Sequence, residues 1–287
     1  LFSLYLLLAI GFKGGIEIQK SGFTGQVLPT LSAAILMSLI IPLIGFIILR
    51  YKFDVFNSAA IAAAYGSISA VTFISAESFL ESQSITFDGF MVGALALMES
   101  PAIIVGLLLV KFAAPNNRPN SRKMHSSSIF HESLLNGSVF LLLSSLIVGF
   151  LTAFSNPSGI LKMEPFTGQL FYGAECFFLL DMGIVAAQRL PRLKSAGSFL
   201  IGFAIFMPLI NALIGVFVAR FLSLGPGNAL LFVVLCASAS YLAVPAAMRM
   251  TVPEAKSSYY ISTTLGLTFP FNIILGIPIY MSLVNKI

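Results

Sequence analysis

The chain of 287 residues is divided into long apolar runs, and this pattern restricts its possible folds more than any other feature. A helix needs about 20 mostly apolar residues to cross the hydrocarbon layer of a bilayer. Nine runs approach or reach this length: residues 1–12, 27–49, 56–80, 87–112, 134–154, 166–187, 197–221, 228–250 and 258–284. Charged residues make up 9% of the chain, against about 25% in soluble domains. We therefore expect an all-α polytopic protein embedded in a lipid bilayer.

The first run is short because the chain begins inside it. No basic segment precedes this run, as one would in a signal peptide, so we expect a further membrane helix before residue 1. Residues 1–112 then form a first half with four of its five helices present. Residues 134–287 form a second half with five.

Residues 113–133 are the longest polar stretch, rich in Pro, Asn and Ser and carrying Arg118, Arg122 and Lys123. Basic loops lie preferentially on the cytoplasmic side of a membrane, so these residues are predicted to be a flexible cytoplasmic linker. Most of the sixteen Lys and Arg residues then fall on that side. Their scatter over short loops does not favour nucleic-acid binding.

Short motifs recur in the two halves at nearly constant spacing. Ser240 follows Ser69 by 171 positions (240 − 69 = 171), and Asp181 follows Gly11 by 170 (181 − 11 = 170). Because each half would hold an odd number of helices, the second half must be inverted relative to the first. Inverted repeats are typical of secondary transporters.

Two apolar runs contain dense groups of small and hydroxyl residues, in YGSISAVTF (65–73) and CASASYLAVP (236–245). Such residues also let neighbouring helices pack closely, but these groups are denser than packing requires and occupy the same place in both halves. Gly weakens a helix, and Ser or Thr can pair with the freed backbone groups. We predict a helix break at each, the second one assisted by Pro245.

A broken helix presents free N–H groups and a positive dipole end at the start of its second half. Two breaks that cross near the middle of the membrane would bind a small anion there, with hydroxyl groups as additional donors. The predicted substrate-binding residues are Gly66, Ser67, Ser69, Thr72, Ser238 and Ser240.

Ionisable residues inside membrane segments are functional candidates, and three occur here: Glu99, Glu175 and Asp181. Glu99 precedes Ser100-Pro101, where we expect a kink, and its carboxylate could bind a cation or carry a proton. For Asp181 we expect a place near the cytoplasmic third of its helix and an ion pair with Lys13 or Arg189.

Signals for other chemistry are weak. His125 and His131 lie in the linker without zinc-ligand spacing, and Cys176 and Cys236 sit in apolar runs as free thiols. No hydrolase, metalloprotease or nucleotide-binding motif occurs. We predict a protein that is not an enzyme, with no cofactor and no metal beyond a transported sodium ion.

The order of the motifs resembles the cyanobacterial sodium-dependent bicarbonate transporters of the SbtA type. The matching stretches are GFKGGIEI, YGSISAVTF, FDGFMVGALALMESPAIIVGLLL, CASASYLAVPAAMRMTVPEA and SSYYISTTLGLTFPFNIILGIPIY. The resemblance implies ten helices in two inverted five-helix repeats, organised as a core and a gate domain in a homotrimer of the bacterial inner membrane. It also implies that bicarbonate and sodium bind where the broken helices cross, and that a soluble PII-like regulator binds the cytoplasmic side.

The resembling proteins have Asp at the positions of Glu99 and Tyr241. The residues expected to couple transport to a cation or proton are therefore Glu99, Ser100, Tyr241 and Asp181. We expect a secondary transporter that imports bicarbonate with sodium as one domain moves past the other. A proton-coupled carrier of another small inorganic or organic anion, and an anion channel or receptor-like protein, remain alternatives.

Overall fold

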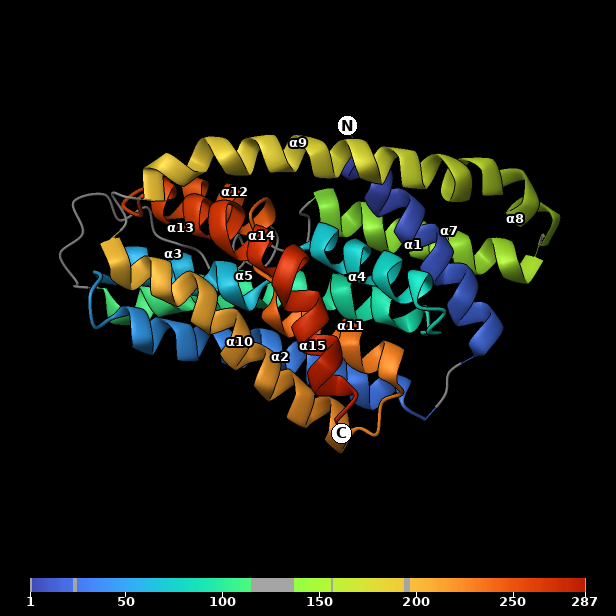
Figure 1. The fold of residues 1–287 in the computed structure, drawn as a ribbon, viewed down its shortest axis with the longest axis horizontal. Coiled ribbons are helices and arrows are strands. Elements are labelled where there is room, and N and C mark those ends of the chain that lie inside the picture. Colours follow the sequence, from blue (N-terminus) through green and yellow to red (C-terminus); the bar gives the residue numbers. More distant parts are fainter. Residues whose placement is uncertain (1, 23–24, 115–136, 156, 194–196, 287) are drawn as a thin grey trace.

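A computed structural model describes residues 2–22, 25–114, 137–155, 157–193 and 197–286, which form helices and no strand (Figure 1). The α-helices are α1 (Phe2–Ser21), α2 (Val27–Leu49), α3 (Val55–Gly66), α4 (Ala70–Ser82), α5 (Phe90–Ala113), α7 (Gly137–Ser155), α8 (Pro157–Glu164), α9 (Leu170–Leu193), α10 (Gly197–Phe221), α11 (Pro226–Ala237), α12 (Ala243–Thr251), α13 (Ser257–Thr263), α14 (Phe269–Phe271) and α15 (Ile277–Val284). The π-helical turns are η1 (Pro165–Gln169), η3 (Thr264–Thr268) and η4 (Asn272–Gly276). Six described helical spans are long and apolar enough to cross a membrane, which confirms a multi-pass membrane protein.

The helices agree with the predicted runs except at two of them. The sixth run, 166–187, lies within the longer helical stretch of α8, η1 and α9, and the first run differs as well. That run was expected to end at residue 12, whereas α1 continues to Ser21. Its charged residues have partners: Lys13 Nζ lies 4.8 Å from the ring centroid of Phe171, and Lys20 Nζ lies 2.9 Å from Glu17 Oε1. Nearly all of the predicted linker, residues 115–133, lies outside the described residues.

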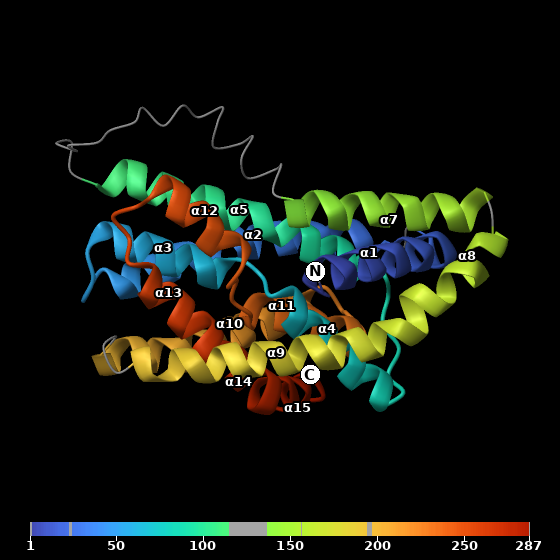
Figure 2. The ribbon, with the colours of Figure 1, turned by 90° about the horizontal axis from the view of Figure 1, so that it is seen from above.

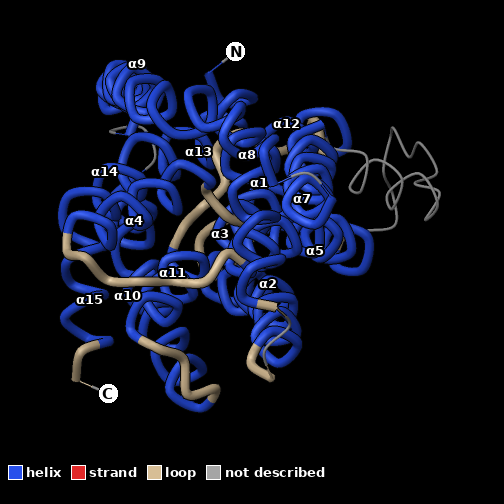
Figure 3. The backbone as a smooth tube through the Cα atoms, turned by 90° about the vertical axis from the view of Figure 1, so that its right-hand side faces the viewer, coloured by secondary structure: helices blue, strands red, loops and turns tan. Residues whose placement is uncertain are grey.

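The broken helices form the centre of the bundle and α9 its edge. Within the most apolar window of residues 55–82, 89% of the residues are buried, against 28% in the window of α8 to α9. Figure 1 shows α9 running along one side of the molecule, and Figure 3 shows most helices nearly end-on along its long axis. The polar breaks are therefore enclosed by protein rather than by lipid.

Helices α1 and α7 touch backbone to backbone. A Cβ atom on Gly15 would lie 2.0 Å from the Leu146 carbonyl oxygen, and one on Gly149 would lie 2.1 Å from that of Phe12. Small residues permit such close approach between membrane helices. The two helices are therefore in direct backbone contact at both glycines.

A proline in α10 creates a polar link to the centre. Pro208 has no N–H, so the carbonyl of Ala204 loses its helical donor, and Thr268 Oγ1 donates to it instead at 2.7 Å. Because the single hydroxyl proton of Thr268 is used there, Tyr65 Oη, 2.7 Å away, donates to Thr268. This chain of bonds ties α3 to η3 and α10.

Two asparagines that are 171 positions apart (228 − 57 = 171) make matching contacts at the starts of the broken helices. Asn57 Oδ1, in the first turn of α3, accepts a hydrogen bond of 2.8 Å from Lys256 N, just before α13. Asn228 Oδ1, in the first turn of α11, accepts one of 2.8 Å from Asp88 N, just before α5. Each asparagine thus holds a segment from the other half of the chain.

Asp54 caps the N-terminus of α3, since its side chain accepts from Asn57 N at 3.0 Å. Partial burial disfavours the charged form, but the hydrogen bonds from Asn57 and from backbone N–H groups outweigh this and hold the pKa of Asp54 below its usual range. The corresponding N-cap of α11 is Gly225, which provides no side-chain bond.

Candidate functional site

The first helix break lies between α3 and α4. The helix stops at Gly66, where a Cβ atom would lie 2.0 Å from Cγ of Pro42 in α2. Ser67 then adopts an extended backbone, with φ of −96° and ψ of 172°. After residues 67–69 the chain resumes a helix at Ala70, so the predicted break is confirmed.

The second break, between α11 and α12, is longer. Helix α11 ends at Ala237, Ser238 is extended with φ of −78° and ψ of 171°, and α12 begins at Ala243. Pro245 was expected to interrupt the helix, but it lies in the first turn of α12, where a missing N–H costs little. The break therefore precedes Pro245 and is formed by residues 238–242.

The two breaks are bonded to each other. Ser240 N donates to the Ala64 carbonyl at 2.8 Å. In the opposite direction Ser69 N donates to Ser238 Oγ at 3.1 Å, and this hydroxyl passes its own proton to the Leu235 carbonyl at 3.1 Å. Backbone groups freed at each break are thus paired by the other break, which fixes the crossing.

The four serines at the crossing divide into two functional pairs. Ser67 donates its hydroxyl proton to the Glu99 carbonyl at 3.3 Å, as Ser238 does to Leu235. Ser69 Oγ, by contrast, accepts from Thr72 N and Thr72 Oγ1 at 3.2 and 2.9 Å. Within the described part of the chain, no acceptor is found for the hydroxyl proton of Ser240, and the Ser69 proton faces only the Tyr241 hydroxyl, so both can turn to a ligand.

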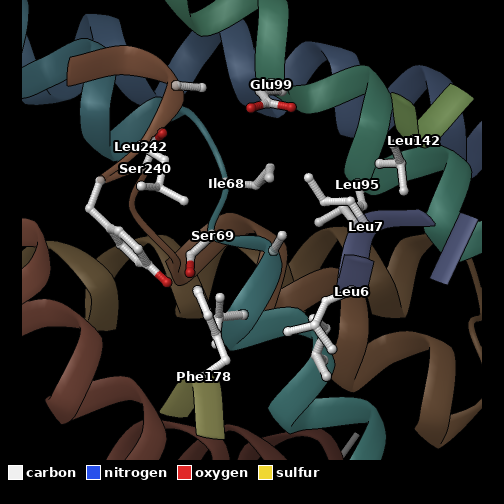
Figure 4. A pocket seen from close by; sticks show the side chains of 15 residues that line it. Leu6, Leu7, Ile68, Ser69, Leu95, Glu99, Leu142, Phe178, Ser240 and Leu242 are labelled. Atoms are coloured by element: carbon white, nitrogen blue, oxygen red, sulfur yellow. The ribbon is translucent and has the colours of Figure 1, made fainter. Parts of the chain in front are cut away.

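A cavity of about 40 Å³ opens at the crossing (Figure 4). Its polar side chains are Ser69, Ser240, Glu99 and Tyr241, and its apolar wall includes Leu6, Leu7, Leu142 and Phe178 from α1, α7 and α9. One water needs about 10–15 Å³ by this measure, so the cavity admits a ligand of only a few non-hydrogen atoms.

The electrostatics of the cavity favour an anion near the serines. Helices α4 and α12 both begin at its wall, at Ala70 and Ala243. The first N–H groups of a helix have no intrahelical partner, and they carry the positive end of its dipole. Hydroxyl and backbone donors are therefore gathered in one small space, with no Lys or Arg among the lining residues.

Glu99 is the only carboxylate among the residues lining this cavity. It belongs to α5, which runs without interruption through Pro101, so the expected kink does not break the helix. Its side chain is 7% exposed and points toward the cavity (Figure 4). Among the described residues none donates a hydrogen bond to its carboxylate, which is thus available to a cation or a proton.

Tyr241 lies in the same wall, with its ring 5.5 Å from that of Phe269 in an edge-to-face contact. Its buried hydroxyl lies beside the Ser69 hydroxyl, but makes no hydrogen bond of ordinary geometry within the described part of the chain. An unpaired buried hydroxyl costs about 1–3 kcal/mol, so this group is a further candidate for a ligand contact.

The structure divides the predicted site residues into three groups. Ser69, Ser240, Glu99 and Tyr241 line the cavity; Gly66, Ser67, Thr72, Ser238 and Ser100 belong to the surrounding framework. Asp181 is on the exposed face of α9 and away from the cavity. Its expected pair with Lys13 is wrong, because Lys13 stacks on aromatic rings and the ion pair of the described residues joins Lys20 to Glu17. The side chain of Arg189, the other expected partner, lies outside the described part of the chain.

Sequence reasoning missed the residues that hold the second break in place. Asn272 Nδ2 donates to the Ala237 carbonyl at 3.0 Å, and Tyr280 Oη donates to Asn272 Oδ1 at 2.7 Å. An amide inside an apolar run at LTFPFNIIL is a signal that could have found Asn272. The last carbonyl of α11 is thereby paired and withdrawn from the cavity.

Across the described residues, no group of three His, Cys, Asp or Glu side chains is arranged to hold a metal ion. A sodium ion at this site would be cargo, bound by carboxylate, hydroxyl or carbonyl oxygens.

Comparison with known proteins gives one informative result. The family model of the Na+-dependent bicarbonate transporter superfamily matches residues 1–285. A comparison with curated proteins gives no significant match.

Proposed function

The chain belongs to the Na+-dependent bicarbonate transporter superfamily, and from this premise we propose that it imports bicarbonate together with sodium through the cavity at the helix crossing. The cavity carries the proposal, because its size and its donors suit a planar oxyanion of four non-hydrogen atoms. Ser69, Ser240 and the N–H groups of α4 and α12 would bind the anion. They hold it without the fixed positive charge that would slow its release.

Glu99 would provide the coupling. A carboxylate beside an anion site repels the anion unless a cation or proton neutralises it, so occupancy of Glu99 by sodium favours binding of bicarbonate. Ser100 and Tyr241 are neighbouring candidates for this role, whereas Asp181 is remote from the cavity.

The paired contacts support two inverted repeats, residues 1–112 and 134–287, joined by the linker at 113–133. Asn57 and Asn228 each accept a hydrogen bond from a backbone N–H of the opposite half. The serine pairs 67/238 and 69/240 have the same spacing and make corresponding hydrogen bonds. We assign α2–α5 and α10–α15 to a core domain that carries the site. Helices α1, α7, α8 and α9 form a gate domain past which the core moves in an elevator-type cycle.

The resemblance to the SbtA-type proteins extends the proposal to assembly. A homotrimer in a bacterial inner membrane, with the linker cytoplasmic and in contact with a PII-like regulator, fits this fold. Cross-linking in native membranes followed by mass measurement tests the trimer, and a pull-down of the intact chain tests the regulator.

Uptake of labelled bicarbonate into proteoliposomes tests the function. We expect uptake that requires an inward sodium gradient and that chloride, which is not an oxyanion, leaves largely unaffected. Absence of uptake under both sodium and proton gradients would overturn the proposal.

One observation favours a proton-coupled carrier as a second candidate. Glu99 faces the cavity without a basic partner, a setting suited to a carboxylate that exchanges a proton. In that case a pH gradient drives uptake, and Glu99→Gln abolishes it while sodium has no effect.

A further inference from the structure

A second cavity, of about 560 Å³, lies between the proposed core and gate domains. It is lined by α1, η1 and the start of α9 on one side and by the last turns of α4 on the other. Glu81 shares a face of α4 with Glu77 and with Ser78, since it follows them by four and three positions. They face Lys13, Tyr172 and Glu175 of the gate.

Two side-chain contacts cross this boundary. Ser78 Oγ lies 3.0 and 3.2 Å from the two carboxylate oxygens of Glu175, and Tyr172 Oη donates to Glu81 Oε2 at 2.7 Å. In both, a hydroxyl donates to a carboxylate, and such charge-assisted bonds are stronger than neutral ones. Each has one end on α4 and the other on α9.

Lys13 reinforces the gate side. Its ammonium lies over the rings of Phe171 and Tyr172, at 4.8 and 5.6 Å from their centroids. This contact orients Tyr172 from within the gate domain, because α1 and α9 both belong to it. Tyr172 is thus held in position for Glu81 by the domain that does not move.

We propose that the contacts of Ser78 with Glu175 and of Tyr172 with Glu81 form a latch that holds this conformation and must open in every transport cycle. The proposal rests on the elevator movement, because displacement of α4 along α9 by even a few ångströms separates both pairs beyond hydrogen-bond distance. The strength of the latch sets the fraction of protein molecules in this conformation and therefore the rate of transport.

A reversible cross-link tests the latch. In a Cys176→Ser background, Ser78→Cys with Glu175→Cys places two thiols where a hydrogen bond now joins the side chains. We expect oxidation to reduce sodium-driven uptake at least tenfold and reduction to restore it. Full uptake by the oxidised, cross-linked protein overturns the latch, while absence of uptake already in the reduced protein counts against the proposed function instead.

A distance measurement tests the latch without transport. Spin labels at Ser82→Cys and Gln169→Cys report on α4 against η1, and labels at Lys20→Cys and Gln169→Cys report within the gate. We expect two distances for the first pair, with populations that shift on addition of sodium and bicarbonate, and one for the second. A single, unchanged distance for the first pair under all conditions overturns the latch.

Point variants provide a matched comparison. Tyr172→Phe removes a hydroxyl that crosses the boundary, whereas Tyr5→Phe removes one that bonds the Phe166 carbonyl inside the gate domain. We expect only Tyr172→Phe to shift the populations of the first spin-label pair, by roughly three- to tenfold. Equal effects of the two variants contradict the latch.

Discussion

The two helix breaks that meet at the cavity have serines at corresponding positions, but they differ in length and in capping. The first is three residues long, and Ser69 caps the new helix through Thr72. The second is five residues long, and its N-cap, Leu242, provides no side-chain bond; Val244 N reaches Ser240 Oγ only at 3.3 Å. Figure 2 labels the helices on either side of the two breaks, α3 and α4, and α11 and α12. A short, capped break fixes the position of its donors, while a longer, loosely capped one lets them adjust around a ligand.

The largest predicted difference is in thermal stability, and it concerns the last residues of α3 and α11, Gly66 and Ala237. Gly66→Ala places a methyl group against the rigid ring of Pro42 and should lower the midpoint of thermal unfolding by roughly 4–8 °C. Ala237→Gly only loosens a helix end and should lower it by roughly 1–4 °C. Thermal unfolding in detergent measures both, and equal losses would show that the first break is not held by the contact with Pro42.

Substitution of the asparagines at the starts of α3 and α11 should lower the free energy of unfolding by similar amounts. Asn57→Ala and Asn228→Ala each leave a backbone N–H without its partner, at a cost of about 1–3 kcal/mol in the free energy of unfolding. Asn211→Leu is the matched control, because both amide atoms of this buried residue lack partners in the described structure. We expect Asn211→Leu to be neutral or stabilising, and a loss confined to one of Asn57 and Asn228 would break the proposed symmetry.

The smallest predicted effect concerns pH at the two N-caps. The pKa of Asp54 is lower in the folded protein, so its contribution to stability is complete above the unfolded pKa of about 4 and disappears as the pH falls through the folded value. The stability difference between the parent and Asp54→Asn should therefore shrink below about pH 4. Gly225→Ala, at the N-cap of α11, should show a pH-independent difference over the same range.

Most of the fold could be predicted from the sequence because the length of an apolar run is enough to identify a membrane helix. The two breaks were also predictable, since Gly66 and the serine groups stand out in apolar surroundings. The end of α1 was not, because Lys13 is accommodated by the ring of Phe171, which is distant in the sequence, while Lys20 pairs locally with Glu17.

The candidate site was predictable in type but not in detail. Ser67, Ser69, Ser238 and Ser240 look equivalent in the sequence, and only their hydrogen bonds separate the structural pair from the pair with free protons. Backbone donors were expected after each break, but the sequence did not show that the helices resume at Ala70 and Ala243. Asp181 was indistinguishable from Glu99 by composition, because both are acids in apolar runs and only the packing shows which one faces the cavity.

Equilibrium binding of labelled bicarbonate, in the presence of sodium, to the four single serine-to-alanine variants tests the central claim most directly. Hydrogen bonds to charged groups contribute about 1.5–3 kcal/mol, so Ser69→Ala and Ser240→Ala should raise the Kd roughly 10- to 100-fold. Ser67→Ala and Ser238→Ala, whose protons are used on carbonyls, should lower thermal stability and change the Kd less than about threefold. The opposite pattern, with binding lost at Ser67 and Ser238 and retained at Ser69 and Ser240, would contradict the account.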